Sequence, residues 1–420
     1  MLIHLITHLC RERLSMIGKR LYSFNRFDII LLFIIVSLWL GGLGVSLGCV
    51  RLLAILMFPL LLVSINKSRF YIKPFVVFFI VVEIYCIISL LWTSNEQQGV
   101  KEIVYNIIHF SLYLEIIVFS SLAKRPLNSI SYGWIIAVLC CSVISIWEIS
   151  TGQHLSDTYD YAEGGDRVIG EEIVEQFITA VTFGNYNSYV LFLCYSFPWM
   201  AYAYLESQGF KKRIIPFVAM LMAVTFVLYN ASRGGMVSLI IMLTIYLFFY
   251  HKSVGKVFFA LLIVGVVVFY LIQYAGDVVA LVSYRMSGDI FKDSERTALL
   301  SDGLDILSST FGVGVGVGGA TTSLNMSPHN LLLEIALDYG VLFTLVFIWY
   351  LFRLFVKSVM QKNDKVRLVL LMSLVSLPFY SVINSTYILQ PQLYVFLATL
   401  CVFANCDKIK KNYYECNSFK

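Results

Sequence analysis

Three residues in the second half of the chain have side chains that can act on a phosphorylated substrate. Arg233 lies in residues 230–235 (NASRGG), between two apolar runs, and Arg296 opens an amphipathic pattern. A guanidinium group pairs bidentately with phosphate oxygens and keeps its charge at physiological pH. His329, in residues 327–330 (SPHN), can take a proton from a hydroxyl as a general base near pH 7. These side chains suit a reaction in which a hydroxyl attacks and a phosphate leaves.

Each candidate also has an ordinary structural interpretation. A lone arginine such as Arg233 can anchor a helix at headgroup depth. Arg285 and Arg296 lie among acidic residues and can form salt bridges, and His329 can cap or pack a helix start. Two glycines after Arg233 favour a site, because they would let a bulky ligand approach the backbone. Arg296, four residues after Lys292, is a better candidate than Arg285.

The composition predicts that membrane helices position these residues. The chain has 420 residues, of which 59% are hydrophobic and 14% charged, and its mean hydropathy is +0.80. A soluble domain has about 25% charged residues and covers its surface with them. This composition excludes a soluble enzyme, a disordered chain and a nucleic-acid binder. We expect an all-α, polytopic integral membrane protein that forms one domain over residues 1–420.

Twelve runs are long and apolar enough to cross a bilayer, which takes about 20 residues as a helix. They are continuously apolar, whereas strands of a membrane barrel would alternate. The run at 50–65 is short and has Arg51 near its start. The expected spans are residues 28–49, 50–65, 74–92, 104–122, 130–149, 187–204, 214–231, 235–251, 257–275, 340–356, 368–386 and 389–405.

The basic residues fall on alternate connections between these runs. With a cytoplasmic N-terminus, the inner segments hold 24 of the 31 lysines and arginines. This is the positive-inside pattern, and it predicts that both termini are cytoplasmic. The basic residues left on the outer side are Arg51, Lys101, Arg167, Arg233, Arg285, Lys292 and Arg296.

Two outer segments, residues 150–186 and 276–339, are long, and we expect them to be the two large periplasmic loops. Loops beyond about 12–15 residues are usually functional, so recognition or catalysis is expected on the outer face. In the second loop, residues 297–307 predict an amphipathic helix with its leucines on one side. The run GVGVGVGG (312–319) predicts tightly turning backbone rather than a phosphate-binding loop. A short helix is expected to follow it and to end before Gly340.

We expect neither a metal nor another cofactor. The nine cysteines form no CxxC pair, and no cysteine–histidine cluster has metal-ligand spacing. The first 27 residues are not expected to be a cleavable signal peptide. The outer face has no ATP, so a transferase there needs an activated donor such as a lipid-linked pyrophosphate. Arginines can stabilise the leaving pyrophosphate, a task often given to a metal ion.

Three stretches together resemble the bacterial O-antigen polymerase and O-antigen ligase superfamily. They are TFGNYNSY at 182–189, the Ser-Arg-Gly motif opening the helix at 229–249, and the outer loop from Arg296 through the glycine run to SPHNLLLEIALDYGVLF at 327–343. The likeness is close over about 180–345, and elsewhere it extends to topology and length.

The resemblance implies a metal-independent, inverting glycosyltransferase of the membrane-embedded type C. It would act on undecaprenyl-pyrophosphate-linked glycans at the periplasmic face of the inner membrane. By this likeness Arg233 and Arg296 bind the pyrophosphate and His329 assists deprotonation of the acceptor. Arg285 is a companion whose register against Arg296 stays open, because this chain lacks the aromatic residue that often follows the loop arginine. The supporting residues of these motifs are Ser232, Gly234 and Asn330.

Three functions remain open. An O-antigen polymerase, which the aromatic-rich and cysteine-tolerant sequence favours, would join a lipid-linked glycan donor to a lipid-linked acceptor, and the resemblance leaves open whether a chain-length regulator binds. A ligase would instead transfer the glycan to lipid A-core. A transporter or flippase of a lipid-linked or anionic solute would use intramembrane charges such as Glu83 and Glu115. Glu148, near the outer end of its helix, is expected to reach water.

Overall fold

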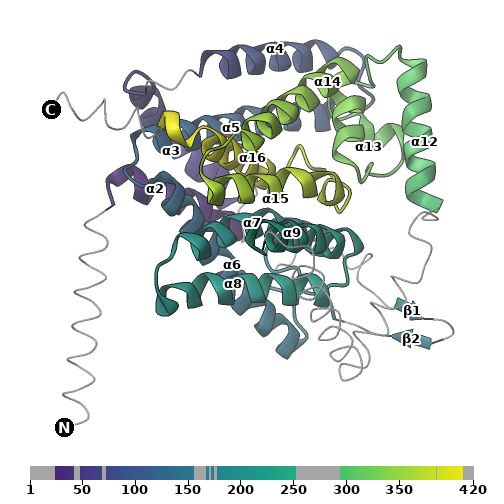
Figure 1. The fold of residues 1–420 in the computed structure, drawn as a ribbon. Helices are drawn as coiled ribbons and strands as arrows, with labels where there is room; N and C mark the ends of the chain where they lie inside the picture. The colour runs from purple at the N-terminus through teal and green to yellow at the C-terminus, as the bar shows by residue number, and fades with distance from the viewer. Residues whose placement is uncertain are drawn as a thin grey trace, which may run out of the picture.

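The structure is a computed structural model that describes residues 24–41, 48–68, 72–155, 167–169, 172–174, 177–251, 294–384 and 386–409. The described part is a bundle of helices with one small hairpin (Figure 1). Its helices are α2 (Arg26–Val36), the 3-10 helix η1 (Ser37–Leu40), α3 (Cys49–Ile65), α4 (Lys73–Ser89), α5 (Glu96–Leu122), α6 (Pro126–Thr151), α7 (Tyr186–Glu206), α8 (Phe210–Tyr229), α9 (Arg233–His251), α12 (Ser294–Ser309), α13 (Ala320–Ser323), α14 (Leu331–Val359), α15 (Asp364–Tyr380) and α16 (Pro391–Ala404).

Helices occupy eleven of the twelve ranges in which we predicted spans, and the remaining range, 257–275, lies outside the described residues. Within the described part, α5, α6, α8 and α14 are long and apolar enough to cross a membrane, and α3, α9 and α16 are shorter apolar helices. The helices are therefore consistent with a multi-pass membrane protein. The number of crossings and the side of each terminus stay predictions.

The all-α prediction is incomplete in the first large loop. Strands β1 (Arg167–Ile169) and β2 (Glu172–Val174) pair antiparallel there, with Val168 opposite Ile173. Valine and isoleucine fill four of these six positions, and their β-branched side chains favour strands. The prediction missed the pair because three-residue strands carry almost no periodic signal.

Asparagine begins five of the described helices. In each case the side-chain oxygen accepts a hydrogen bond from a backbone N–H two or three residues later, which satisfies donors that a helix start leaves open. These N-caps are Asn25, Asn95, Asn185, Asn330 and Asn363. Local sequence thus sets where α2, α5, α7, α14 and α15 begin.

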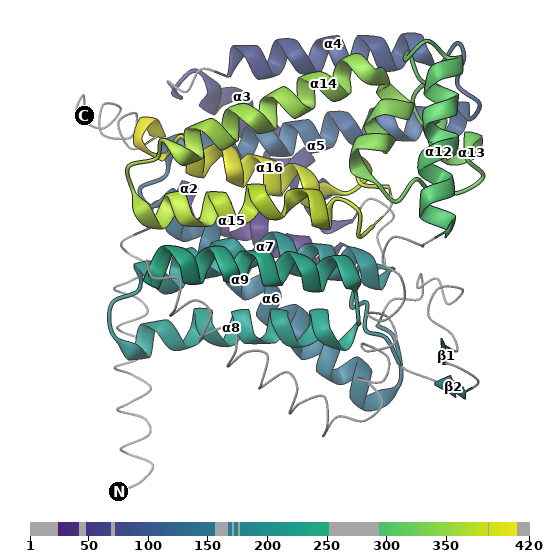
Figure 2. The ribbon, with the colours of Figure 1, turned by 45° about the vertical axis from the view of Figure 1, so that its right-hand side comes forward.

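The outside of the bundle is apolar and its centre is aromatic. Helix α7 is buried along most of its length, and its Tyr195 ring stacks 4.3 Å from the ring of Phe396 on α16. Helices α4 and α8 lie at opposite edges of the bundle (Figures 1 and 2) and expose large apolar side chains such as Phe217, which is 53% exposed. An apolar exterior around a packed interior is what lipid surroundings require.

The segments that the charge pattern assigns to the inner side meet at one end of the bundle. Asp28 lies in the first turn of α2. It accepts hydrogen bonds from the backbone N–H groups of Lys124 at 3.2 Å and Arg125 at 2.8 Å. Glu206, at the end of α7, pairs with Lys365 of α15 at 2.9 Å. The opposite end, on the right in Figures 1 and 2, carries α12, α13 and the hairpin. The segments predicted to be inner thus lie together at one end of the bundle, and which side of the membrane this end faces stays a prediction.

The glycine run between α12 and α13 turns as tightly as its composition predicts. Gly314, Gly316 and Gly318 have φ of 88°, 86° and 73°, in the left-handed region that favours glycine. A Cβ on Gly316 would lie 2.8 Å from the Ser89 carbonyl oxygen, and one on Gly318 would lie 2.5 Å from the Gly99 nitrogen. The run is therefore backbone packed directly against the corner between α4 and α5.

The same run fits into a break in α14. Gly340 has φ 85° and ψ 164°, so the helix is interrupted there and a short helical piece precedes it, as predicted. The Val341 N–H donates to the Gly312 carbonyl at 2.9 Å, and the Val315 N–H donates to the Leu337 carbonyl at 2.7 Å. Breaking α14 exposes backbone groups that the glycine run then satisfies.

Helix α12 matches the predicted amphipathic helix, but its leucines do not share one environment. Leu299 and Leu307 are each 8% exposed, and Gly303 between them lies against Leu333 of α14. Leu300 and Leu304 are 43% and 55% exposed. The leucines lie on one side of the helix, but only the 299–303–307 row packs against α14, because Gly303 has no side chain and lets Leu333 approach.

Candidate functional site

Arg233 begins α9 immediately after the end of α8. Asn230 ends α8 and is fully buried, and Ala231 has φ 47°, so the chain reverses within a few residues. Ser232 is also buried, and its carbonyl accepts the first helical hydrogen bond of α9, from the Met236 N–H at 2.9 Å. Arg233 is half-buried at this corner. The corner fixes the arginine backbone at the outer end of the bundle.

The glycines after Arg233 serve a different purpose from the one we predicted. A Cβ on Gly234 would lie 2.8 Å from a side-chain carbon of Ile383, and one on Gly235 would lie 2.5 Å from a side-chain carbon of Val190. The space beside them is filled by the segment after α15 and by α7. Gly234 therefore lets helices meet closely and does not leave room for a bulky ligand on that side.

His329 lies just before α14 in a conformation that is uncommon for its type. Its φ is 47°, in the left-handed region, which costs free energy for a residue with a Cβ. Its neighbours fix the chain there: the Asn330 side chain accepts from Leu332 N at 3.0 Å and Leu333 N at 3.1 Å. The Leu331 N–H donates to the Ser381 carbonyl at 3.0 Å. Asn330 thus supports the site as the cap that follows the histidine.

The end of α15 connects the two candidate positions. Gly234, next to Arg233, packs on Ile383 and the Phe379 carbonyl, and Leu331, two residues after His329, bonds to Ser381. One short segment, 379–383, therefore lies between the first turns of α9 and α14. Two helix N-termini near an arginine make this end of the bundle favourable for an anion.

The loop arginines are only partly located. Arg296 lies in the first turn of α12, which stands across the outer end of the bundle in Figures 1 and 2. Helix α12 packs on the short piece of α14 through Gly303 and Leu333, four residues beyond His329. Arg285 lies outside the described residues. The structure thus brings the backbone of Arg296 to the end of the bundle that carries Arg233 and His329.

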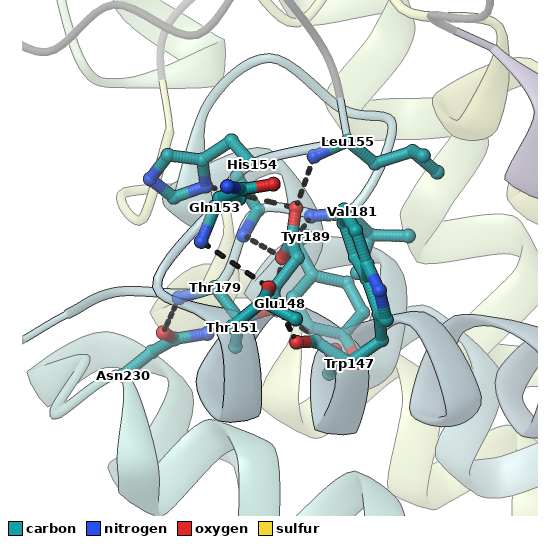
Figure 3. Close-up of polar contacts among 12 residues, drawn as sticks. Trp147, Glu148, Thr151, Gln153, His154, Leu155, Thr179, Val181, Tyr189 and Asn230 are labelled. Carbon is teal, nitrogen blue, oxygen red and sulfur yellow. Dashed lines mark hydrogen bonds and ion pairs between the residues drawn. The ribbon is translucent and has the colours of Figure 1, made fainter.

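Glu148 is the centre of a buried hydrogen-bond network at the outer end of α6 (Figure 3). It is fully buried and does not reach water, which corrects our expectation. One carboxylate oxygen accepts from the Thr179 hydroxyl at 2.6 Å, and from Ala180 N at 3.1 Å and Val181 N at 3.0 Å. The other accepts from Leu155 N at 3.1 Å. A single carboxylate thus ties both ends of the first large outer loop to α6.

This network extends to the Arg233 corner. The Thr179 N–H donates to the Asn230 side-chain oxygen at 3.2 Å, three residues before Arg233 (Figure 3). His154 is also present, with its Nδ1 3.6 Å from the Glu148 carboxylate and its ring stacked on Phe177. Glu148 therefore positions the segment that leads into α7 and, through Thr179, the corner that carries Arg233. The sequence signal for this role of Glu148 was an acidic residue near the end of an expected span, followed by a polar loop.

Two acids of the short piece of α14 act in the same way on other outer segments. Glu334 accepts from Tyr387 N and Ile388 N, each at 3.0 Å, and so holds the connection between α15 and α16. Asp338 accepts from Ala320 N at 2.9 Å and so holds the start of α13. Neither role could be predicted from the sequence, because the partners lie 18 or more residues away in the chain.

Two intramembrane acids have no such role. The carboxylate oxygens of Glu83 and Glu115 are buried and make no hydrogen bond with any described residue. A partly buried hydrogen bond joins Arg51 Nε to His109 Nε2 at 2.8 Å. Among the described residues, no group of three histidine, cysteine, aspartate or glutamate side chains can hold a metal ion.

Comparison with known proteins confirms the resemblance noted in the sequence. Residues 217–348, about a third of the chain, match the family model described as O-antigen ligase. The matched stretch contains Arg233, Arg285, Arg296 and His329. The chain is also similar to the teichuronic acid biosynthesis protein TuaE of Bacillus subtilis, at 21% identity over 337 residues. That alignment covers 73% of this chain and 66% of the relative's length. No solved structure matches the chain significantly.

Proposed function

We propose that this chain is a membrane-embedded glycosyltransferase of surface-polysaccharide assembly, and within that class a polymerase. It transfers a glycan from undecaprenyl pyrophosphate onto another lipid-linked repeat unit at the periplasmic face of the inner membrane. The observation that carries the proposal is the packing of residues 379–383 against the starts of both α9 and α14, which puts Arg233 and His329 at one end of the bundle. The match of residues 217–348 to the O-antigen ligase model supports it.

The proposed step needs an anion site and a base. An acceptor sugar hydroxyl attacks the anomeric carbon of the donor, and the bond from that carbon to the pyrophosphate oxygen breaks with inversion. Arg233 and Arg296, with Arg285 as a third candidate, stabilise the charge that collects on the departing lipid pyrophosphate. His329 takes the proton of the attacking hydroxyl. Ser232 and Asn330 hold the two positions by ending one turn and capping the next helix.

The proposal includes a topology of twelve spans with both termini in the cytoplasm. It is supported by the gathering of basic inner segments at one end of the bundle, around Asp28 and the Glu206–Lys365 pair. Cysteines introduced at Gly152, just beyond α6, and at Lys211, in the first turn of α8, test it. An impermeant thiol reagent added to intact cells should label the first and spare the second; the reverse result would place the site in the cytoplasm.

The activity is tested in a strain that lacks the gene and carries plasmid copies of the chain. A polymerase predicts that the deletion leaves single repeat units on the mature acceptor, and that the wild-type copy restores long chains on a gel. A ligase predicts a different deletion pattern, with polymer stranded on its lipid carrier and none on the mature acceptor. Restoration of long chains by Arg233→Ala or His329→Ala would contradict both readings.

A transporter is the alternative that a specific observation favours, namely the buried carboxylates of Glu83 and Glu115 without hydrogen bonds to described residues. A proton or ion pathway would need these charges. The variants Glu83→Gln and Glu115→Gln therefore separate the two classes. A glycosyltransferase predicts nearly normal chain length in both variants, whereas a transporter predicts that both abolish the surface polymer.

A further inference from the structure

We propose that the inner end of α6, α7 and α8 binds the phosphate headgroup of an anionic phospholipid. A cavity of about 230 Å³ opens there, at the end of the bundle opposite Arg233. The lining residues that the argument uses are Arg125, Asn128, Tyr132, Glu206, Gln208 and Lys212. This site is independent of the proposed glycosyl transfer.

The donors around the cavity suit a phosphate. Arg125 and Lys212 contribute two cations, and the Asn128 and Gln208 amides contribute neutral donors. Arg125 is placed at the start of α6, where the helix dipole adds to the positive potential. Its backbone N–H donates to the buried Asp28 carboxylate at 2.8 Å, which fixes the position of that helix start.

The acid in the cavity wall is already neutralised by a lysine from another helix. Glu206 pairs with Lys365 at 2.9 Å, so the lysine offsets the charge of the acid and Arg125 and Lys212 remain as excess positive charge. Arg213, next in sequence to Lys212, is engaged elsewhere, with its Nε donating to the Ser207 carbonyl at 3.0 Å and its guanidinium over the Tyr204 ring. The cavity therefore keeps a net positive lining.

The surroundings of the cavity favour a lipid over a soluble anion. On α6, the cavity residue Tyr132 begins a row of exposed apolar side chains at helical spacing. Tyr132 and Ile136 are each 38% exposed, and Val143 is 69% exposed. An amphiphile whose phosphate lies in the cavity can run its acyl chains along this row. Basic pockets between helices on the cytoplasmic side are suited to anionic lipid headgroups.

The cavity lies far from the proposed catalytic end, so substitutions there can be tested without changing the proposed active site. Lys212 and Asn230 lie at opposite ends of the 20-residue helix α8, which is about 30 Å long at 1.5 Å per residue. Substitutions at the cavity are thus remote from Arg233. The single variants Arg125→Gln and Lys212→Gln and the double variant remove the two cations. Lys124→Gln and Lys211→Gln are matched controls, since each removes an exposed neighbouring charge that does not line the cavity.

Native mass spectrometry of the full-length protein in detergent measures the binding of phosphatidylglycerol directly. We expect the wild type and both controls to retain the lipid, each single variant to bind it several-fold more weakly, and the double variant at least tenfold more weakly. Phosphatidylcholine, which has no net charge, should bind far less. Size-exclusion profiles that match the wild type show that the variants are folded.

Three outcomes would overturn the proposal. Equal retention of phosphatidylglycerol by the double variant and the controls would mean that the cavity does not bind it. Equal retention of phosphatidylcholine would mean that the anionic charge is not recognised. Displacement of the lipid by millimolar inorganic phosphate or glycerol phosphate would assign the cavity to a soluble anion instead.

Discussion

Glu148 and Thr179 are joined by a hydrogen bond of 2.6 Å in which the threonine hydroxyl donates to a fully buried carboxylate. The bond links α6 to the end of the first large outer loop. The Thr179 N–H also donates to the Asn230 side-chain oxygen, so two successive hydrogen bonds connect the carboxylate to the corner that carries Arg233. A buried charge is costly unless hydrogen bonds compensate it, and here backbone amides and a hydroxyl do so.

We predict that Glu148→Gln lowers both stability and transfer activity. The amide that replaces one oxygen cannot accept, so N–H groups that the carboxylate satisfies lose their partner, at about 1–3 kcal/mol for each buried group. The melting temperature of the purified protein should fall by several degrees and surface-polymer formation should drop at least tenfold. Glu96→Gln, at an exposed glutamate that begins α5, is the matched control and should change neither. Unchanged activity in Glu148→Gln would remove the carboxylate from the positioning of the site.

Arg233→Lys tests whether geometry or charge matters at the α8–α9 corner. A lysine keeps the positive charge but cannot make the two parallel hydrogen bonds of a guanidinium to a pyrophosphate. We expect at least a tenfold loss of polymer in the gel assay, with normal amounts of protein in the membrane. Arg213→Lys at the opposite end of α8 should behave like the wild type. An Arg233→Lys variant with full activity would identify the residue as an interfacial anchor.

Local features of this protein could be predicted from its sequence, and distant contacts could not. Most helix ranges of the described part, the turning glycine run and the interruption at Gly340 follow from composition and periodicity within a few residues. The packing of Gly234 on Ile383 joins positions about 150 residues apart, and the bonds from Glu334 to Tyr387 and Ile388 join positions more than 50 apart. One sequence does not reveal such pairs, because any acid or glycine offers many distant partners.

The same limit applies to the candidate site. The positive-inside pattern predicted that Arg233, Arg296 and His329 lie on the outer side, and the arginines stood out because basic residues are few there. The sequence did not show that the segment after α15 connects the first and last of these, since residues 379–383 contain nothing that signals a contact with either. It also assigned Glu148 to water, because a position near a helix end is usually exposed.

Two substitutions at His329 distinguish the role of its imidazole from the role of its backbone conformation. At φ 47° glycine is favoured over any residue with a Cβ, so His329→Gly should be about 1 kcal/mol more stable than His329→Ala. If the imidazole is the general base, both variants should lose most of the activity despite this difference. Thermal denaturation combined with the gel assay makes the comparison. Activity that follows stability, with glycine restoring function, would show that the position is structural.

Alanine substitutions at Gly314 and Gly152 distinguish backbone strain from steric overlap in the outer loops. Both have positive φ, 88° and 66°, so an alanine at either position costs about 1 kcal/mol in backbone strain. Nothing lies within 4 Å of a Cβ on Gly152, whereas a Cβ on Gly314 would overlap the Leu337 carbonyl oxygen and lie 2.9 Å from that of Ala336. Gly314→Ala should therefore push the glycine run out of the break in α14 and sharply reduce folded protein in the membrane. Gly152→Ala should lower the melting temperature only slightly and keep the activity. Comparable yields and melting temperatures for the two variants would mean that the run does not pack against α14 as the hydrogen bonds around Gly312 and Val315 indicate.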